Sequence, residues 1–440
     1  MRIEVYNHYF KVYSILSIRE ILHKRYIFLD YSECFQRGKF DNTKIKEVSQ
    51  TVWREDFLQF PIGFLSEVRD YLKCISITDC RSRLEQKEVD IRDNLEGITL
   101  YDYQVEAVRV CLEKKNGIIK IPTSGGKTNI FLSIANILHR SRVLILFFQV
   151  NVAKQTYDSA VGLGLDPGLV QGNNCIEDKR IVIASIQSAH KLKDKYDVVI
   201  ADECHHAGAR TYYRILRSSE FSYRLGFSAT PFLKDKYKTS QVKKWLGCIE
   251  YELSAKTLMD LGKIARPEIN IIEIRSPQSI QDLRWPKCEK LGVIDNPVRN
   301  TEISLLATTN PHVLILVRLI RHGKALEQLI DNSIFLHGGI GAEEREKEVK
   351  RFESDNSRVI IASTIFDEGI SIDCIKTIIT AGGGKSQIKT IQRIGRGFRI
   401  DWNKDTVKIF DFWDNTNYIL LRHSRARIAD YKKEGYEIKK

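Results

Sequence analysis

The residues best suited to chemistry form one short stretch, Ile-Pro-Thr-Ser-Gly-Gly-Lys-Thr, at positions 121–128. An apolar run at residues 117–121 leads into it, and an apolar stretch at residues 129–135 follows. A strand, a glycine-containing turn ending in Gly-Lys-Thr and then a helix are the context of a phosphate-binding loop. Glycines let backbone N–H groups point at phosphate oxygens, and the helix N-terminus adds its positive dipole end. The stretch therefore predicts a nucleotide site.

Each polar residue of this loop has a predicted role. Lys127 would bind the β- and γ-phosphates, and the Thr128 hydroxyl would bind Mg²⁺. The general pattern has a glycine where this chain has Ile121. At this point a glycine-rich loop with a chance lysine remains the alternative. The residues expected to line ATP are Pro122, Thr123, Ser124, Gly125, Gly126, Lys127 and Thr128.

A second reactive group, Asp202-Glu203-Cys204-His205, directly follows the apolar run at residues 198–201. Acids at the carboxyl end of a parallel strand lie where α/β sheets bind ligands. Asp202 would hold Mg²⁺, and Glu203 would orient the attacking water. Alone, the pair fits an acidic turn equally well. Its place about 75 residues after the Gly-Lys-Thr sequence favours catalysis.

The elements that must position these residues begin near residue 98, where short β-branched runs alternate with helical stretches. Continuous apolar strands separated by helices predict a parallel sheet covered on both faces. Residues 255–300, which contain four prolines, interrupt the rhythm, and it then resumes. We therefore predict two parallel α/β domains in series. The expected strands are at 143–146, 181–184, 198–201, 225–227, 313–317, 334–336, 359–362, 377–379 and 407–410.

The first 80 residues lack phosphate-loop chemistry. Tyrosines and phenylalanine alternate with polar residues over 2–15, which predicts a strand or hairpin, and residues 65–73 suit a helix. We expect a small α+β module here, joined by a charge-dense linker or exposed helix at 81–97. The predicted domains are the module at 1–90 and the two α/β domains at 91–265 and 266–440.

The overall charge and the cysteines narrow the setting. The formal net charge of +13 suits a polyanionic partner, although a basic surface without a partner is equally compatible with it. The N-terminus lacks the apolar core of a signal peptide, and no apolar run could span a membrane. Nine scattered cysteines with no Cys-x-x-Cys pair fit a reducing cytoplasm. Cys204-His205-His206 is the one tempting metal cluster, and no second cluster supports it.

Two further motifs carry a resemblance to a known family. They are Ser228-Ala229-Thr230-Pro231 and Gln392-Arg393-Ile394-Gly395-Arg396-Gly397-Phe398-Arg399. With the phosphate loop and Asp-Glu-Cys-His, they resemble superfamily 2 helicases in order and spacing. Within that superfamily the chain looks like the phage UvsW type, related to RecG and XPB-like DNA translocases. The resemblance covers about residues 98–415 and implies two tandem RecA-like domains, each a parallel sheet flanked by helices.

The resemblance also implies roles for individual residues. Gln392 would position the water, and Arg396 and Arg399 would reach the γ-phosphate as arginine fingers when the domains close. Further ATP contacts would come from Tyr101, Gln104 and Gly369. Coupling between nucleotide and DNA is implied for His205, Ser228, Ala229 and Thr230. Nucleic-acid contacts are implied for Gln155, Ser185, Gln187, His337 and Thr364.

A sequence that looks like a second phosphate loop, Gly382-Gly383-Gly384-Lys385-Ser386, lies in the second domain. No acidic partner follows it within that domain, and Ile379 stands where the first glycine belongs. We therefore interpret it as a loop at the end of a strand.

The sequence as a whole predicts an ATP- and Mg²⁺-dependent DNA helicase or translocase. The resemblance implies branched DNA as substrate: forks, Holliday junctions, D-loops or R-loops, in recombination, repair or replication. The expected partner is branched or single-stranded DNA, with RNA possible in hybrids, and no membrane. The expected place is the cytoplasm, or the host cytoplasm if a phage encodes the chain. The alternatives are an ATP-dependent RNA helicase and a nucleotide-gated nucleic-acid binding protein that does not unwind.

Overall fold

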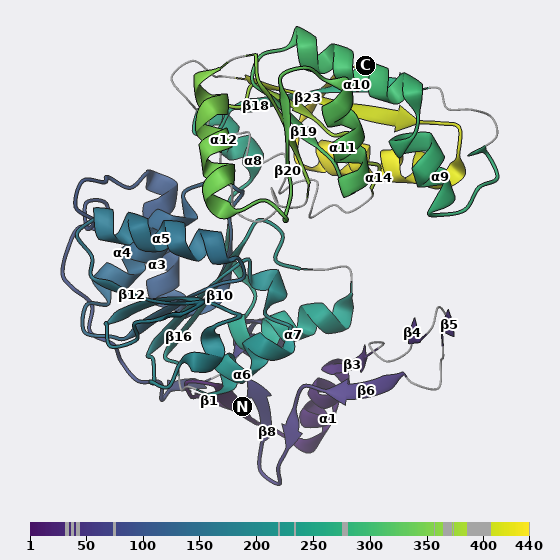
Figure 1. The fold of residues 1–440 in the computed structure, drawn as a ribbon. Coiled ribbons are helices and arrows are strands. Elements are labelled where there is room, and N and C mark those ends of the chain that lie inside the picture. The colour runs from purple at the N-terminus through teal and green to yellow at the C-terminus, as the bar shows by residue number, and fades with distance from the viewer. Residues whose placement is uncertain are drawn as a thin grey trace. The chain divides into compact units, whose positions relative to one another are not determined.

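The computed structural model places the chain in two compact units. One holds Met1–Ile121 with Gly126–Glu252, and the other holds Pro122–Gly125 with Leu253–Lys440. Figure 1 labels their helices and strands. The structure describes residues 1–30, 35–36, 39–40, 45–73, 76–218, 221–232, 235–274, 280–355, 357–363, 372, 374–384 and 406–439.

The main sheet of the first unit contains eight described strands, ordered β13-β12-β14-β11-β15-β16-β10-β17. Every neighbouring pair is parallel except β12 and β13. The inner strands β11, β14, β15 and β16 are buried along their whole length, as their runs of Val, Ile and Leu predict. The bounds are β10 Asn116–Lys120, β11 Val143–Phe147, β12 Pro167–Gln171, β13 Asn174–Cys175, β14 Ile181–Ser185, β15 Val198–Asp202, β16 Tyr223–Ser228 and β17 Ile249–Glu252.

Helices cover both faces of this sheet, with α3, α4 and α5 on one face and α6 and α7 on the other (Figure 1). The strand order explains the two sides, because β10, β11 and β12 progress across the sheet in one direction, whereas β15, β16 and β17 progress in the other. Right-handed crossovers then place the connecting helices on opposite faces. The bounds are α3 Asp102–Lys114, α4 Lys127–Ile137, α5 Val150–Gly162, α6 Arg210–Ser218 and α7 Lys236–Leu246.

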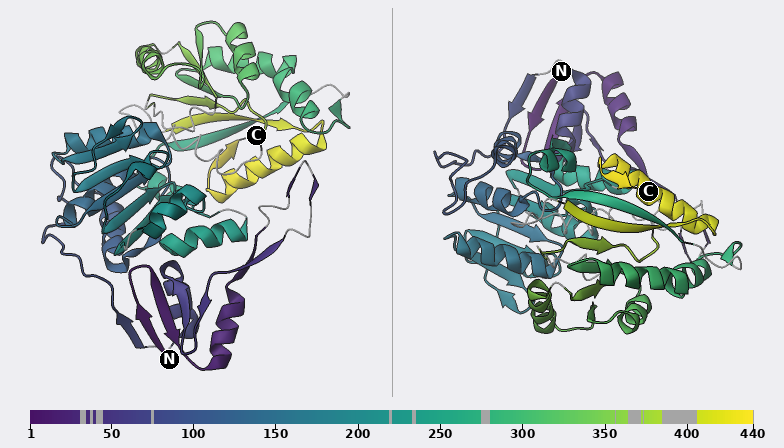
Figure 2. Two further views of the ribbon diagram at one scale, coloured as in Figure 1. Left: turned by 60° about the horizontal axis from the view of Figure 1, so that its bottom comes forward. Right: turned by 90° about the horizontal axis from the view of Figure 1, so that it is seen from above.

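The N-terminal residues form the predicted α+β module. Its sheet is ordered β7-β8-β2-β1-β9, and β1 and β2 form the predicted hairpin. One sheet face packs under α1 and α2 around Phe10, Phe60 and Val68 (Figure 2). Residues 81–97 contain no helix and connect the module to α3. The bounds are β1 Arg2–Val5, β2 Tyr9–Tyr13, α1 Leu16–Arg25, β7 Val52–Trp53, β8 Leu58–Pro61, α2 Leu65–Leu72 and β9 Ser76–Asp79.

The module packs against the end of α7 and against the amino ends of strands in the main sheet. Ser66 Oγ donates to Glu250 Oε1 over 2.7 Å, and Lys243 pairs with Glu67. The buried Arg224, near the start of β16, donates to the Asn7 carbonyl over 3.4 Å. The phosphate loop follows the carboxyl end of β10, so the module and the phosphate loop lie at opposite ends of the strands.

The second unit contains a parallel sheet ordered β20-β21-β19-β22-β23-β18-β24 in its described part. Two parallel sheets with flanking helices confirm the predicted pair of RecA-like domains. The strand β18 was not predicted, because it lies in the proline-interrupted region 255–300 and begins Arg-Pro. Across the described residues, no helix is long and apolar enough to cross a membrane.

The second unit's elements have these bounds. The strands are β18 Arg266–Ile274, β19 Val313–Leu316, β20 Ser333–Leu336, β21 Val359–Ala362, β22 Thr377–Ile379, β23 Thr406–Asp414 and β24 Glu437–Lys439. The helices are α8 Ala255–Asp260, α9 Lys287–Glu289, α10 Pro297–Thr309, α11 Ile320–Leu329, α12 Ala342–Ser354 and α14 Tyr418–Lys433, with a π-helical turn at Lys290–Ile294.

A substitution at Gly63 tests how tightly the module packs against the end of α7. A Cβ at this position would lie 1.7 Å from the backbone oxygen of Lys243 and 2.9 Å from the nitrogen of Gly247. Gly63→Ala should therefore lower the free energy of unfolding by about 1–3 kcal/mol through overpacking, and should speed proteolysis within residues 81–97. Urea unfolding and limited trypsin digestion measure both effects. Gly162→Ala is the control, since nothing lies within 4 Å of its added Cβ. Equal stability and digestion of the two variants would contradict tight docking.

Candidate nucleotide site

The phosphate loop has the predicted strand–loop–helix form, between the end of β10 at Lys120 and the start of α4 at Lys127. Gly126 has a φ of +74°, and an added Cβ would lie 2.2 Å from Gln104 Nε2. Ser124 also has a positive φ, of 66°. The loop is therefore tightly curled, and position 126 requires glycine both for its backbone conformation and for space.

Lys127 lies beside the two acids at the end of β15, which is separated from β10 by β16 alone. Its Nζ is 3.5 Å from Glu203 Oε1 and 3.9 Å from Asp202 Oδ1. Burial acts against the charge of Lys127, but Glu203 and Asp202 outweigh it and raise the pKa of the lysine. The site therefore holds a charged ammonium where the β- and γ-phosphates are predicted to bind.

The two acids have opposite pKa shifts. Burial raises the pKa of Asp202 to about 6, with Lys127 opposing and Glu203 adding to the rise. Burial also acts to raise the pKa of Glu203, but Lys127, His205 and Ser228 outweigh it and lower the pKa. Glu203 is therefore the acid that stays an ionised acceptor, which is the state needed to orient a water.

Glu203 is also the centre of a short hydrogen-bond chain. Ser228 Oγ, at the end of β16, donates to Glu203 Oε2 over 2.9 Å, and His205 Nδ1 lies 3.2 Å from the same Oγ. The backbone N–H of Thr230 donates to Ser228 Oγ over 3.1 Å. Glu203 itself has a positive φ of 45°, a strained conformation for a non-glycine residue that is typical of functional sites. Of the predicted catalytic and coupling residues, the structure thus brings Lys127, Asp202, Glu203, His205, Ser228 and Thr230 into one cluster.

Gln104 links α3 to the phosphate loop, a contact that sequence reasoning missed. Its Oε1 accepts from the Tyr101 N–H over 2.9 Å, and its Nε2 donates to the Gly126 carbonyl over 3.3 Å. The side chain is almost fully buried, whereas Tyr101 is 47% exposed and stacks on Tyr103. The Gln three residues after a helix N-cap was the available signal. Adenine contact by Gln104 and Tyr101 stays a prediction.

The site has the donor chemistry expected for Mg²⁺. Asp202 Oδ1 is buried and accepts no hydrogen bond, although buried carboxylate oxygens normally have a donor. Thr128 lies in the first turn of α4, which follows the loop. Mg²⁺ binds one or two carboxylates together with substrate phosphates rather than a full protein cage, so these residues fit it. Cys204 is buried in the hydrophobic core and its Cβ packs close to Gly226.

Two family models match the chain one after the other. The type III restriction enzyme res subunit matches residues 97–233, and the helicase conserved C-terminal domain matches residues 299–401. Together they cover more than half of the chain, and the first spans the whole cluster around Lys127. The chain is a superfamily 2 helicase. Its enzymatic class is therefore that of an ATP-driven helicase.

Individual relatives agree with this family. The chain is 26% identical to the DNA 3'-5' translocase XPB2 of Sulfurisphaera tokodaii, over 73% of this chain and 85% of that protein. It is 25% identical to the ATP-dependent DNA helicase uvsW of Enterobacteria phage T4, over 76% of this chain and 75% of that protein. The structure of Saccharomyces cerevisiae Dbp5 bound to RNA and ADP BeF3 is similar, with a TM-score of 0.56 and 16% identity, covering 78% of this chain and 90% of that chain.

Of the nucleic-acid residues predicted in the first unit, Ser185 and Gln187 lie at the carboxyl end of β14, and Gln155 lies on α5. Ser185 ends β14, and its buried Oγ makes no hydrogen bond. Gln187 is exposed and donates to the Phe148 carbonyl over 2.8 Å, and Gln155 is exposed on α5. The ring of Phe148 stacks on His206 with centroids 3.8 Å apart, a contact not predicted from sequence. Nucleic-acid contact at these positions stays a prediction.

The remaining predicted residues lie in the second unit. His337 follows β20, and its Nδ1 accepts from the Gly339 N–H over 3.1 Å. The other residues, namely Thr364, Gly369, Gln392, Arg396 and Arg399, lie outside the residues that the structure describes.

The raised pKa of Asp202 predicts a cost of carrying its charge in the metal-free protein. An unfolded Asp has a pKa near 3.9, below the folded value of about 6. This group therefore favours folding fully below pH 3.9, and the benefit is lost as the pH rises through 6. Asp202→Asn should then raise the free energy of unfolding at pH 8, by roughly 2–3 kcal/mol, and by less at pH 5.

Urea unfolding with EDTA at both pH values measures this effect. Asp158→Asn, which alters an exposed acid on α5 paired with Lys154, is the control and should show no such pH-dependent gain. An equal or lower stability of Asp202→Asn at pH 8 would contradict the predicted cost.

Proposed function

We propose that this helicase is an ATP- and Mg²⁺-dependent DNA motor that acts on branched DNA in recombination, repair or replication, in the cytoplasm. The observation that carries the ATPase part is the cluster of Lys127, Glu203, Ser228 and His205 at the ends of three neighbouring strands. The relatives named as a DNA translocase and a DNA helicase support DNA as the substrate. Comparing ATPase stimulation by DNA and by RNA tests that choice against an RNA helicase.

In the proposed mechanism Lys127 exchanges partners. In the structure its ammonium is paired with Glu203 and, at a longer distance, with Asp202. The β- and γ-phosphates of ATP, delivered to the curled loop, take over this cation. Thr128 and Asp202 would hold Mg²⁺, which supplies charge neutralisation at the phosphates when bound. Glu203, released from Lys127 and ionised, accepts a hydrogen bond from the water that attacks the γ-phosphate.

From the same cluster we infer how ATP hydrolysis is transmitted to the segment that follows β16. Ser228 donates to Glu203 and is itself held by the Thr230 N–H, so a change at the Glu203 carboxylate alters the backbone that follows β16. We assign this coupling to His205, Ser228, Ala229 and Thr230. Gln392, Arg396 and Arg399 complete the proposal as the residues that act on the γ-phosphate from the second domain.

Glu203→Gln tests the water-orienting role. The amide keeps the shape of the side chain but loses its charge, so DNA-stimulated ATP hydrolysis should fall roughly 10²–10⁴-fold. Affinity for a fluorescent ATP analogue should stay within a few-fold. Lys127→Ala is the matched variant, and it should lose nucleotide affinity as well as turnover. Turnover at the wild-type rate in Glu203→Gln would exclude Glu203 from the reaction.

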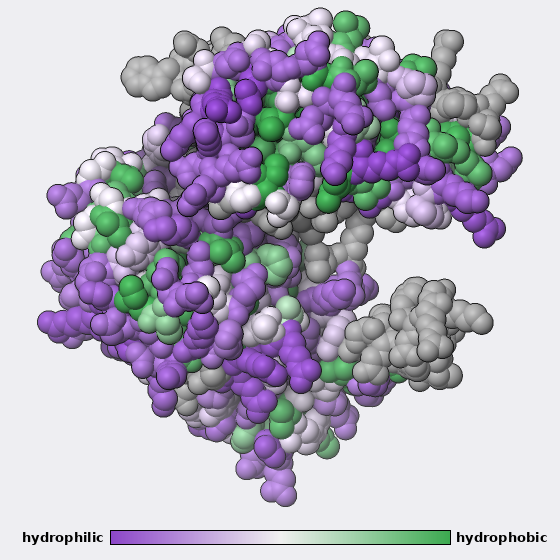
Figure 3. Space-filling model, viewed as in Figure 1, coloured by the Kyte–Doolittle hydropathy of each residue, from purple (hydrophilic) through white to green (hydrophobic). Residues whose placement is uncertain are grey.

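Branch recognition is proposed for the N-terminal module. A motor that tracks one strand has no reason to prefer a junction unless another surface contacts the second arm. The module exposes two aromatic rings beneath cations: Arg19 lies 5.6 Å from the Trp53 ring, and Arg25 lies 4.7 Å from the Tyr71 ring. The rings are 38% and 44% exposed. Exposed rings stack on unpaired bases, and cations attract phosphates, which suits a branch point. The face drawn in Figure 3 is mostly hydrophilic, with small separate apolar areas.

The double variant Trp53→Ala with Tyr71→Ala tests this assignment in the full chain. Losing base stacking should lower the ratio of fork to linear-duplex unwinding about 10-fold. ATPase activity stimulated by single-stranded DNA should remain, because the Lys127 cluster lies at the carboxyl ends of the strands, away from the module. Tyr418→Ala, which removes a ring that is 62% exposed on α14, is the control. An unchanged fork preference in the double variant would place branch recognition outside these rings.

A further inference from the structure

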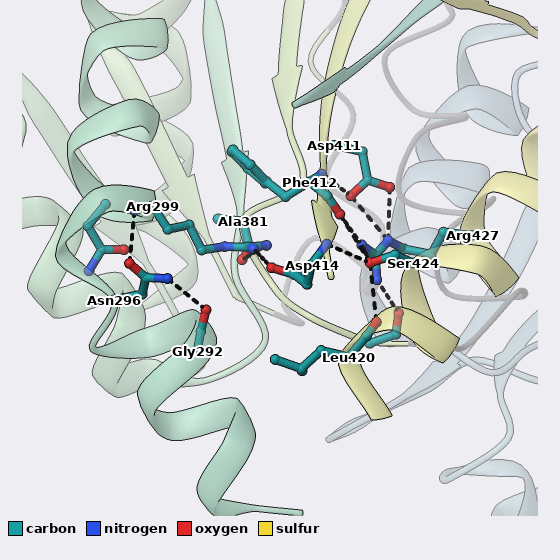
Figure 4. Close-up of polar contacts among 12 residues, drawn as sticks. Gly292, Asn296, Arg299, Ala381, Asp411, Phe412, Asp414, Leu420, Ser424 and Arg427 are labelled. Atoms are coloured by element: carbon teal, nitrogen blue, oxygen red, sulfur yellow. Dashed lines mark hydrogen bonds and ion pairs between the residues drawn. The ribbon is translucent and has the colours of Figure 1, made fainter. Parts of the chain in front are cut away.

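A buried ionic network in the second unit surrounds the loop that follows β22. Figure 4 shows its two halves, one around Arg299 and one around Arg427. Both arginines and their partners, Asp414 and Asp411, are at most 3% exposed. Buried ion pairs are costly to desolvate and add little stability compared with apolar packing, so a network of this size calls for another role.

Arg427, on α14, is hydrogen-bonded at all three of its side-chain nitrogens. Its Nε donates to Asp411 Oδ2 over 2.9 Å, and its Nη2 donates to the Phe412 carbonyl over 2.9 Å. Its Nη1 donates to the Gly384 carbonyl over 2.9 Å. Tyr431 Oη also donates to Asp411 Oδ2, over 2.8 Å, but contacts no part of the loop through this bond. Burial acts to raise the pKa of Asp411, but Arg427 and Tyr431 outweigh it and lower the pKa, so the pair is ionised.

Arg299, on α10, holds the other end of the same loop. Its Nη1 donates to Asp414 Oδ1 over 2.5 Å, and its Nη2 donates to the Ala381 carbonyl over 3.2 Å. Its guanidinium lies 4.3 Å from the centre of the Phe412 ring. The backbone of Arg299 is fixed in turn by Asn296, which caps α10 by accepting from the Arg299 N–H.

The loop between these two arginines is closely packed. The Gly382 N–H donates to the Leu316 carbonyl over 3.1 Å. A Cβ on Gly382 would lie 3.0 Å from the Arg318 nitrogen, and one on Gly383 would lie 2.9 Å from Val293. The backbone of residues 381–384 thus has both end carbonyls held by buried guanidiniums and its middle enclosed by neighbouring elements.

The role of the network follows from the position of this loop in the sequence. Gly384 immediately precedes residues 385–405, the segment that carries Gln392, Arg396 and Arg399. β23 starts at Thr406, directly after that segment, and contains Asp411 and Asp414. Arg427 therefore ties the residue before the segment to the strand after it. We propose that Arg427 and Arg299 are positioning residues, which fix the two ends from which the arginine-finger segment departs and returns. This inference rests on the function proposed above for that segment.

The test is Arg427→Lys in the full chain. Lysine keeps a positive charge beside Asp411 but cannot donate simultaneously to Asp411, Phe412 and Gly384, because it lacks the planar fork of arginine. Misplacing a catalytic group by about 1 Å costs up to about 100-fold in rate, so kcat of the DNA-stimulated ATPase should fall roughly 10- to 100-fold. The ATP analogue affinity and the DNA concentration for half-stimulation should stay within a few-fold.

Tyr431→Phe is the matched control. It also removes a hydrogen bond from the buried Asp411, but it leaves the Gly384 contact in place. Its kcat should stay near the wild-type value even where its melting temperature falls as far as that of Arg427→Lys. A merely structural network would instead lower kcat in both variants in proportion to their loss of stability, which would overturn the proposal.

Two further variants separate the possible failures. Arg299→Lys releases the Ala381 end of the loop, and it decides the proposal if Arg427→Lys does not fold. Arg396→Ala measures the finger role itself. If Arg396→Ala loses stimulated turnover while both lysine variants keep it, the positioning role is wrong and the proposed function stands. If Arg396→Ala and Arg399→Ala keep normal turnover, the function proposed for the segment fails, and the positioning role fails with it.

Discussion

The candidate nucleotide site of this helicase depends on the charge of one lysine, Lys127. Asp202 is buried and Lys127 and Glu203 are largely shielded from solvent, which by itself would favour the neutral form of each. The attraction between Lys127 and the two acids, with His205 and Ser228 acting on Glu203, outweighs burial and keeps Lys127 and Glu203 ionised. The same lysine is the cation that phosphate oxygens would compete for. The site thus holds its cation in an internal ion pair, and in the proposed mechanism the phosphates replace the two acids as the partners of Lys127.

The order of strands explains why this pairing forms and where the module lies. Strands β15, β16 and β10 are neighbours although they come from distant parts of the sequence, so their carboxyl ends bring Glu203, Ser228 and Lys127 together. The module packs at the amino ends of β16 and β17. Helix α7 starts a few residues after Pro231 and its far end contacts the module through Lys243. One helix, α7, therefore starts shortly after Ser228 and ends at the N-terminal module.

The sequence predicted the local features of this structure and missed most of the long-range ones. The phosphate loop, the acidic pair and the apolar strands were predicted, because a curled anion-binding loop requires glycine and fully covered parallel strands require apolar runs. β18 escaped because the strands predicted for these domains were continuous apolar runs, whereas β18 mixes isoleucine with polar residues and has a proline as its second residue. The Gln104 contact with Gly126 and the buried Arg427 network escaped because a polar side chain does not specify in sequence which distant carbonyl it will bind. Arg427 looks like one more basic residue of a surface helix until its burial is known.

Lys127 and Arg427 differ in a way that matches the roles proposed for them. In the first unit, Asp202 Oδ1 has no hydrogen-bond donor and Lys127 is shared between two acids, so the cluster is incomplete and open to a ligand. In the second unit, each side-chain nitrogen of Arg427 has a partner, two of them backbone carbonyls, whereas Arg299 Nε and Asp414 Oδ2 in the other half of the network have none. A saturated cation has nothing left to offer a ligand, and releasing any of its bonds would leave a buried polar group unpaired. The first arrangement is suited to exchange and the second to holding the backbone still. A motor needs both properties. An arginine finger increases the rate of hydrolysis only if the backbone that carries it stays fixed while the phosphate is bound.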